Sequence, residues 1–252
     1  MKKLATILIS AMLVLSLTAC GNSNQNTVED TPAETEITTP VTESEDSSTE
    51  STVGNAVSGT ETSDTEGAGG SKILIAYFSV METDGVDTVA GASRVAVNGE
   101  VLGNNQYIAQ IIQQETGGDL FSIETVQEYP TTHDPLLEFA YNEKADNARP
   151  ELATQIENLD SYDVIFLGFP NWNADLPMPL YTFLEEYDFS GKTIIPFTTH
   201  GGSGFSRTIQ TISELQPNAT VIFDGLSISR NSVSGAESDV IDWVKGLNLT
   251  TE

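Results

Sequence analysis

Three polar segments hold the residues best suited to chemistry, and each directly follows an apolar run. The first begins at Ser79, is interrupted by residues 80–102, and resumes with Gly103, Asn104, Asn105 and Gln106. A serine hydroxyl beside the free backbone N–H groups of a helix N-terminus suits an anion. Gly and Asn before a helix are also ordinary capping residues, so this segment alone leaves both interpretations open.

The second segment contains Pro170, Asn171, Trp172 and Asn173. Trp172 offers a large flat surface on which a planar ligand can stack, and amide side chains lie beside it in the sequence. The alternative is that Trp172 only covers the edge of a sheet. The segment by itself does not decide between the two.

The third segment spans residues 199–205, and its members are Thr199, His200, Gly201, Gly202, Ser203, Gly204 and Phe205. Three glycines in four positions leave backbone N–H and C=O groups uncovered, so a flat heterocycle can lie against the main chain with Phe205 at its edge. His200 is the candidate proton donor or ligand contact. Packing within the loop is the alternative role for this histidine.

The elements that must position these segments alternate along the chain. Apolar runs predict strands at residues 73–78, 119–126, 163–168, 193–197 and 220–223. Helical patterns lie between and after them, at residues 106–115, 150–159, 179–187, 206–215 and 238–247. This alternation predicts a doubly wound α/β fold, in which the strand-to-helix loops gather at the carboxyl edge of a parallel sheet.

The motifs together resemble the flavodoxin-like family, in its single-domain branch. The resemblance rests on Tyr77-Phe78-Ser79, Gly103-Asn104, Phe169-Pro170-Asn171-Trp172 and Thr199-His200-Gly201-Gly202-Ser203-Gly204, and it covers residues 72–247. It implies a five-stranded parallel sheet of order 2-1-3-4-5 and a noncovalent FMN. It also implies a phosphate site at Ser79 and residues 103–106, and two isoalloxazine loops at residues 170–173 and 199–205.

The chain departs from the family pattern at two places. Residues 80–102 divide a phosphate loop that is compact in ordinary flavodoxins, and Asn173 stands where many relatives have a second aromatic residue. We therefore expect the flavin ring to stack on Trp172 alone.

For two further residues we expect a simple structural role, with a chemical role as the alternative. His133 is expected to be a surface turn histidine, with proton donation as its alternative role. Arg207, just past the glycine-rich segment, is expected to be solvated, with a nicotinamide phosphate or a flavin carbonyl as its alternative partner. Two histidines and one cysteine predict no metal site.

The N-terminal part predicts an export signal followed by a spacer. Residues 1–20 combine two lysines, a short apolar run and small residues that end at Cys20. Leu17-Thr18-Ala19-Cys20 resembles the lipobox of bacterial lipoproteins, which implies lipidation of Cys20. Residues 21–71 are rich in Ser, Thr and Glu and predict a disordered acidic tether. Residues 72–252 form the predicted flavodoxin-like domain.

The charge balance excludes some partners and favours others. The 252 residues carry 37 acids against 10 bases, a formal net charge of -27, which argues against nucleic acid. Eleven acids lie in the tether and two lysines in the signal, so residues 72–252 keep 26 acids and eight bases. This acidity favours a basic docking surface on a redox partner.

The sequence predicts a lipid-anchored protein of the cell membrane whose domain works outside the cytoplasm, binds FMN and transfers electrons. Its partner would be a redox protein or a small quinone-like molecule. Two alternatives stay open. One is an FMN-dependent NAD(P)H or quinone oxidoreductase, and the other is a flavin-binding protein without catalytic activity.

Overall fold

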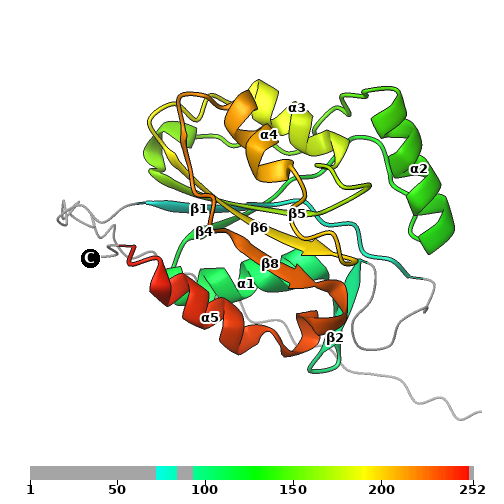
Figure 1. Ribbon diagram of the computed structural model, residues 1–252, viewed down its shortest axis with the longest axis horizontal. Helices are drawn as coiled ribbons and strands as arrows, with labels where there is room; N and C mark the ends of the chain where they lie inside the picture. The colour runs from blue at the N-terminus through cyan, green and yellow to red at the C-terminus, as the bar shows by residue number, and fades with distance from the viewer. Residues whose placement is uncertain (1–71, 84–92, 250–252) are drawn as a thin grey trace, which may run out of the picture. The chain divides into compact units, whose positions relative to one another are not determined.

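The computed structural model describes residues 72–83 and 93–249. The predicted signal with Cys20 and the predicted tether lie outside the described residues, as do residues 84–92 of the interruption. A parallel sheet lies at the centre of the domain, with helices on both faces (Figure 1). Its strands are β1 (Ile73–Tyr77), β4 (Asp119–Ser122), β5 (Val164–Pro170), β6 (Thr193–His200), β7 (Thr220–Val221) and β8 (Leu226–Ser229).

The strand order confirms the predicted topology. The order is β4-β1-β5-β6-β7, and β8 also pairs with β6 in parallel, so the fifth position of the sheet is shared by two short strands. The strand predicted at 220–223 therefore extends two residues past the end of β7, and the prediction misses β8. Gly225 lies between the two strands, where a Cβ would overlap the backbone oxygen of Pro196. Only glycine allows the chain to pass so close to β6 there.

The core has two layers because the central strands are buried on both faces. In β1, Ile73 and Ile75 face one hydrophobic cluster, while Leu74 and Ala76 face the other. This alternation follows from the period of two in a strand. Helices α1 (Asn104–Thr116) and α5 (Glu237–Gly246) cover the first face, and α3 (Met178–Glu186) and α4 (Thr208–Leu215) cover the second (Figure 1).

These four helices agree with the helices predicted at 106–115, 179–187, 206–215 and 238–247 to within two residues at each end. The helix predicted at 150–159 is wrong. Leu152 instead forms an antiparallel bridge with Thr125, and Ala153 donates its backbone N–H to Glu124 at 2.8 Å. The segment runs alongside the chain that leaves β4, and only the 3₁₀ turn η1 (Leu159–Ser161) is helical.

One further helix, α2 (His133–Ala145), is not among the predicted helices, and it lies beside α3 at the side of the domain (Figure 1). Its Leu136 and Ala140 are buried, whereas Leu137 and Tyr141 are exposed. Pro135 falls within its first turn, where a proline is tolerated. His133 is thus the first residue of a helix rather than part of a surface turn.

The interruption between β1 and α1 contains a hairpin of β2 (Arg94–Val97) and β3 (Glu100–Gly103), which form a separate antiparallel sheet. Asn98 and Gly99 both have positive φ, at 53° and 86°, as the tight turn of such a hairpin requires. Val95 is fully buried in the cluster beneath α1. The hairpin is therefore packed into the core, and its base places Arg94 opposite Gly103 at the start of α1.

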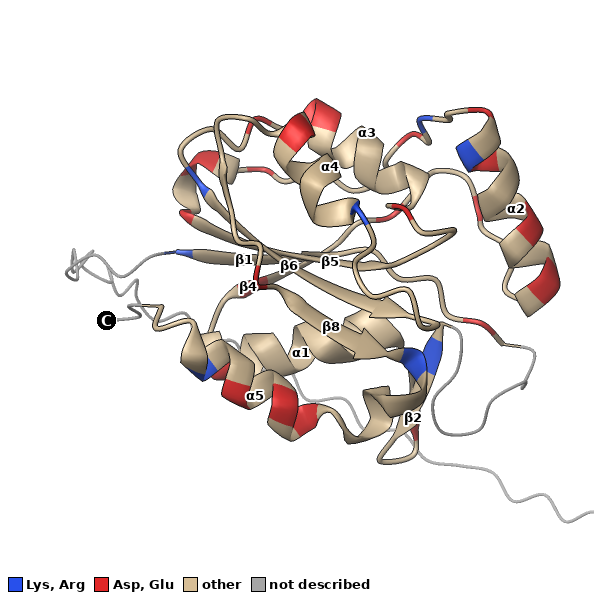
Figure 2. Cartoon of the chain, in the orientation of Figure 1, with Lys and Arg blue, Asp and Glu red and all other residues tan. Residues whose placement is uncertain are grey.

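Acidic residues are spread over α2, α3 and α5, and basic residues are few (Figure 2). Arg94 opens β2 and Arg230 opens the 3₁₀ helix η2 (Arg230–Gly235), and these two elements contact each other. None of the described helices has the length and apolar character to cross a membrane.

Candidate functional site

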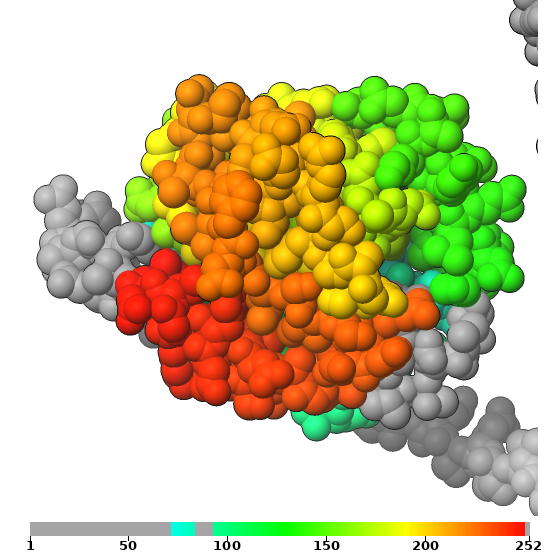
Figure 3. Space-filling view, in the orientation of Figure 1, coloured from blue at the N-terminus to red at the C-terminus, as the bar shows by residue number. Residues whose placement is uncertain are grey.

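A cavity of about 290 Å³ lies at the carboxyl edge of the sheet, where the loops after β5 and β6 meet α2 and η2. The surface is hollowed between α2 and the loop after β6 (Figure 3). Of the predicted site residues, it is lined by Pro170, Asn171, Trp172, Asn173, Thr199, His200, Gly201 and Ser203. Further lining residues are Glu82, Ser93, His133, Leu136, Leu137, Ala140, Ala174 and Arg230. The second and third sequence segments therefore share one cavity.

A tight turn holds Trp172. The backbone of Trp172 donates to Asp175 at 3.2 Å and accepts from Asp175 at 3.0 Å. Between them, Asn173 and Ala174 have φ of 53° and 59°. Two successive positive φ values define a type I′ turn, and for alanine this backbone conformation is unfavourable. Local strain is thus maintained beside the residue predicted to stack on a ligand.

Side chains from α2 and α3 hold this turn from outside. Lys144 Nζ donates to Asn173 O at 2.8 Å and lies 3.1 Å from Asp175 Oδ2. Asp175 Oδ1 accepts from Tyr181 Oη at 2.9 Å, and burial, together with this contact, raises the pKa of Tyr181 to about 12. Tyr181 therefore stays a neutral donor at physiological pH.

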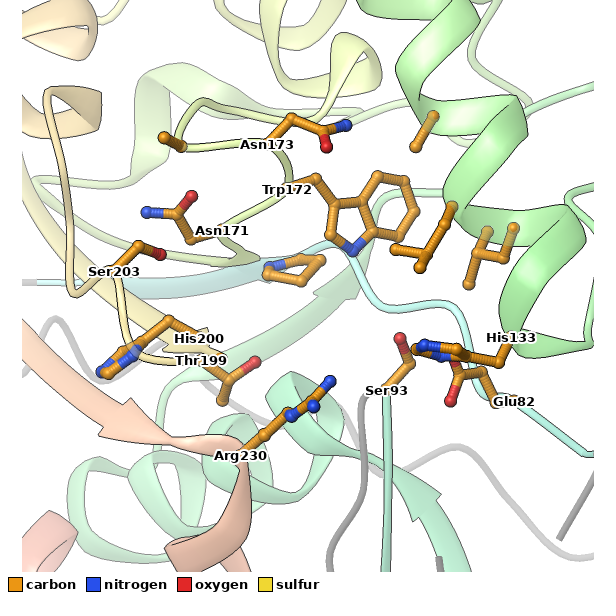
Figure 4. A pocket seen from close by; sticks show the side chains of 16 residues that line it. Glu82, Ser93, His133, Asn171, Trp172, Asn173, Thr199, His200, Ser203 and Arg230 are labelled. Atoms are coloured by element: carbon orange, nitrogen blue, oxygen red, sulfur yellow. The ribbon is translucent and has the colours of Figure 1, made fainter. Parts of the chain in front are cut away.

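The indole of Trp172 has aromatic neighbours within the domain. Phe78, the residue after β1, meets it edge to face at 5.5 Å between ring centroids, and Tyr129 lies 5.8 Å away at an interplanar angle of 51°. Tyr129 is fixed in turn by Glu143 of α2, whose carboxylate accepts from Tyr129 Oη at 2.8 Å. The indole stands in the cavity wall, with Asn171 and Ser203 on one side and His133 with Glu82 on the other (Figure 4).

Asn171 joins the two loops. Its backbone N–H donates to Thr199 O at 2.8 Å, and its Nδ2 donates to Gly204 O at 2.6 Å. Its Oδ1 is buried and has no hydrogen-bond partner among the described residues. The amide therefore ties the glycine-rich loop to the Trp172 loop and keeps one acceptor for another group.

His200 ends β6 and is turned toward its own loop. Gly202 donates its backbone N–H to His200 Nδ1 at 2.9 Å, so the neutral ring carries its proton on Nε2. Partial burial lowers the pKa of His200. Phe205 does not line the cavity; it packs on Phe169, with ring centroids 6.3 Å apart, and so faces the sheet.

The first sequence segment lies near the cavity but does not line it. Asn105 Nδ2 donates to Thr199 Oγ1 at 3.1 Å, which links the start of α1 to the loop after β6. A Cβ on Gly103 would overlap Ser79 Oγ, so the hydroxyl packs directly on this glycine. Gln106 Oε1 accepts from the Gly103 N–H at 3.2 Å. Ser79 and the start of α1 are thus adjacent, despite the 23 residues that the sequence places between Ser79 and Gly103.

Glu82, which is buried, and His133, which is half-buried, form a pair on the opposite wall from the glycine-rich loop (Figure 4). Glu82 is only 3% exposed, and its Oε1 lies 2.8 Å from His133 Nδ1. The sequence marks His133 as a candidate but does not mark Glu82, because a single acid in a long interruption carries no pattern. The start of α2 brings the two together.

Arg230 also lines the cavity, although nothing beside it in the sequence marks it as a site residue. It follows β8 directly, and β8 runs in register with β6 as far as the pair His200 and Ser229. Arg230 therefore stands beside Gly201, and a Cβ on that glycine would lie 3.8 Å from Arg230 Cζ. Its side chain extends into the cavity (Figure 4).

Comparisons with known proteins agree with this architecture. No curated protein matches the chain. A protein from Bacteroides uniformis assigned as a flavoprotein has 27% identity and a TM-score of 0.54, over 70% of this chain and 99% of that one. One from Bacteroides eggerthii has 24% identity and a TM-score of 0.52, over 72% and 99%. A flavoprotein from Lactobacillus acidophilus, solved in complex with FMN, has 20% identity and a TM-score of 0.45, over 67% and 99%.

The family described as flavodoxin matches residues 72–247, which are most of the chain and nearly all of the described residues. This range contains every strand of the sheet and all three sequence segments. The chain therefore belongs to the flavodoxin family, the FMN-binding family that its strand-end loops resemble.

Proposed function

We propose that this protein binds FMN noncovalently in the cavity between the loops after β5 and β6, and transfers electrons outside the cytoplasm. One observation carries the proposal: the fold brings Trp172 and the glycine-rich loop to the same cavity. The loop begins at Thr199, 27 residues after Trp172 in the sequence. A flat apolar surface beside uncovered backbone groups is what a conjugated heterocycle needs. Family membership supplies the identity of the heterocycle.

The residues present fit this cofactor. The cavity volume is near the lower end of the range of about 300–1,000 Å³ for ligand pockets, which suits the flavin ring with its side chain outside the cavity. Asn105 is 1% exposed, and its Oδ1, like that of Asn171, has no partner among the described residues. Buried acceptors without donors are costly, and hydroxyl or N–H groups of the cofactor would satisfy them.

The protein's own groups have distinct tasks in this proposal. Trp172 provides the stacking surface, and the backbone around residues 201–204 faces the polar edge of the ring. Ser79 with the first turn of α1 holds the phosphate, because the N–H groups of Asn105 and Gln106 have no intrahelical acceptor. FMN, when bound, supplies the one- and two-electron redox chemistry.

An FMN titration of the full-length chain tests the proposal. We expect flavin fluorescence to be quenched with saturation, and the quenching to weaken strongly in Trp172→Ala. The control is Trp243→Phe, because Trp243 belongs to α5, packs on Phe166 and does not line the cavity. A chain that leaves FMN fluorescence unchanged contradicts FMN binding, whatever its fold.

A second candidate is an FMN-dependent NAD(P)H or quinone oxidoreductase. It is favoured by the ionisable residues Glu82, His133 and Arg230, which add charge to the cavity wall beyond what stacking a neutral ring requires. Steady oxidation of NAD(P)H by a quinone would identify the enzyme, and reduction only by a partner reductase would identify the carrier. FMN binding without either reaction would identify a non-catalytic flavin-binding protein.

We also propose that the protein is anchored in the cell membrane by a lipid on Cys20, with the acidic segment 21–71 as spacer. The motif Leu17-Thr18-Ala19-Cys20 supports this localisation. In cells, Cys20→Ser should move the protein from the membrane fraction to a soluble or unprocessed form. Equal membrane fractions for both chains would contradict lipid anchoring.

The acidity of the domain favours a redox partner with a basic docking surface.

A further inference from the structure

Arg230 differs from the other cations of the domain in what surrounds it. Among the described residues, the side chains of Lys72, Lys144, Arg149 and Lys245 form ion pairs with acids, and Lys192 donates to the Tyr162 carbonyl. Arg230 forms no ion pair or hydrogen bond within the described part of the chain, although the domain has a large excess of acids.

Arg207 is the useful comparison, since its side chain also has no partner among the described residues. Arg207 is exposed and directly precedes α4, so water can solvate its charge. Arg230 is partly buried and lines the cavity. A guanidinium that is partly removed from water and has no anion is unfavourable, so its position is explained best by a ligand that pairs with it.

The fold fixes the guanidinium at one place. Register with β6 sets Arg230 beside Gly201, where a Cβ would be in ordinary van der Waals contact with the guanidinium. Ser93, which is 6% exposed, adds a hydroxyl to the same cavity. Across the cavity, the indole of Trp172 and the aliphatic side chains of α2 provide apolar surface.

The ionisable groups elsewhere on the cavity wall do not pair with Arg230. Glu82 is hydrogen-bonded to His133 at 2.8 Å and forms no ion pair with Arg230. His200 has a lowered pKa, which favours its neutral form. Arg230 is therefore the unpaired permanent cation among the described lining residues, and it faces the apolar surface across the cavity.

We propose that Arg230 makes this cavity a recognition site for negative charge on a flat conjugated ring, with the guanidinium pairing with the charged edge. Two sources share that chemistry. One is the flavin ring of the proposed function, which gains negative charge on reduction. The other is a quinone-like substrate that carries an ionised hydroxyl or carboxylate. The first source rests on the proposed function, whereas the second can be tested without FMN.

The experiment compares the full-length wild type with Arg230→Gln, Arg230→Lys and the matched control Arg207→Gln. The two Gln substitutions each remove one positive charge, whereas Arg230→Lys keeps it. Of the two arginines, Arg230 lines the cavity and Arg207 does not. Urea unfolding of each chain shows whether it is folded. Arg230→Lys keeps the charge, so it should behave like the wild type if charge rather than packing on Gly201 is responsible.

The first arm measures the two-electron midpoint potential of bound FMN. Loss of positive charge disfavours the reduced, more negative ring, so Arg230→Gln should lower the potential by about 30 mV for each tenfold loss of preference for the reduced form. Arg230→Lys and Arg207→Gln should leave it near the wild-type value. This pattern would identify the flavin as the source of the negative charge.

The second arm measures dissociation constants for ionised 2-hydroxy-1,4-naphthoquinone and for neutral 1,4-naphthoquinone. Arg230→Gln should weaken binding of the anion by about tenfold or more and leave the neutral quinone unchanged. This pattern would identify a substrate as the source. If Arg230→Gln changes neither the potential nor the preference for the anion, the inference is wrong. If FMN does not bind, the proposed function fails, and the second arm, run on the chain without FMN, still decides the inference.

Discussion

Lys144 of α2 is paired with Asp175 of the loop after β5, with 3.1 Å between Nζ and Oδ2. The same ammonium donates to Asn173 O at 2.8 Å. One side chain thus connects α2 to an inner residue and to the last residue of the tight turn that presents Trp172. The site depends on a helix that contributes no residue to the central sheet.

Lys144→Met should loosen the turn while it keeps the aliphatic stem. Because the ion pair is partly exposed, its loss should raise the FMN dissociation constant only about two- to fivefold. Flavin fluorescence titration measures the effect. Lys245→Met breaks a partly exposed pair with Glu115 on the other face of the sheet, so it should leave FMN binding unchanged. Equal effects of both substitutions would mean that the turn does not depend on Lys144.

Gly103→Ala should destabilise the fold by about 1–3 kcal/mol, because the new methyl group would overlap Ser79 Oγ. Urea unfolding measures the change in the free energy of unfolding. Gly246→Ala is the control, since a Cβ there meets no heavy atom within 4 Å. Ser79→Ala in the Gly103→Ala background should recover part of the loss. A stable Gly103→Ala chain would contradict the close packing of Ser79 on the start of α1.

Asn171→Asp should weaken FMN binding by about tenfold or more. The substitution replaces the Nδ2 donor by a carboxylate oxygen that faces Gly204 O, so a hydrogen bond becomes a repulsion between two acceptors. Asn147→Asp introduces the same charge at an exposed position and should have little effect. Unchanged binding in Asn171→Asp would show that the tie between the two loops is not needed for the site.

Acidification should destabilise the glycine-rich loop through His200. The pKa of His200 is lowered in the folded protein, so the unfolded chain binds its proton at higher pH. The contribution to stability is therefore present above the ordinary histidine pKa of about 6.5 and is lost as the pH falls below it. His200→Asn should reduce this pH dependence, measured by urea unfolding between pH 5 and 8. Curves that stay parallel would contradict the assignment.

The topology could be predicted from the sequence because, in a chain that alternates strands and helices, apolar runs such as 163–168 are typical of parallel strands buried on both faces. The helix predicted at residues 150–159 does not form, although Pro150 and Glu151 are typical of a helix start, because the segment after them is bonded to the chain after β4. Helix α2 was missed because its apolar residues form no strong stripe and Pro135 suggested a turn. Local sequence could not reveal these tertiary contacts.

The residues that line the cavity likewise divide into those that the sequence marks and those that it does not. Trp172 and Gly201 could be found because an aromatic residue and clustered glycines after buried strands are unusual in themselves. Glu82 and Arg230 could not be found, because nothing near them in the sequence marks them. Arg230 reaches the cavity through the register of β8 on β6, and Glu82 meets His133 through the placement of α2. Such residues depend on the completed fold.

The central position of β5 has a consequence for the chain during its synthesis. β5 pairs with β1 on one side and β6 on the other, so β1 keeps one open edge until residue 170 has been made. Unpaired parallel edges in partly folded chains promote aggregation. The acidic residues at 21–71 precede that edge in the sequence, and their like charge opposes association between nascent chains before the sheet is complete.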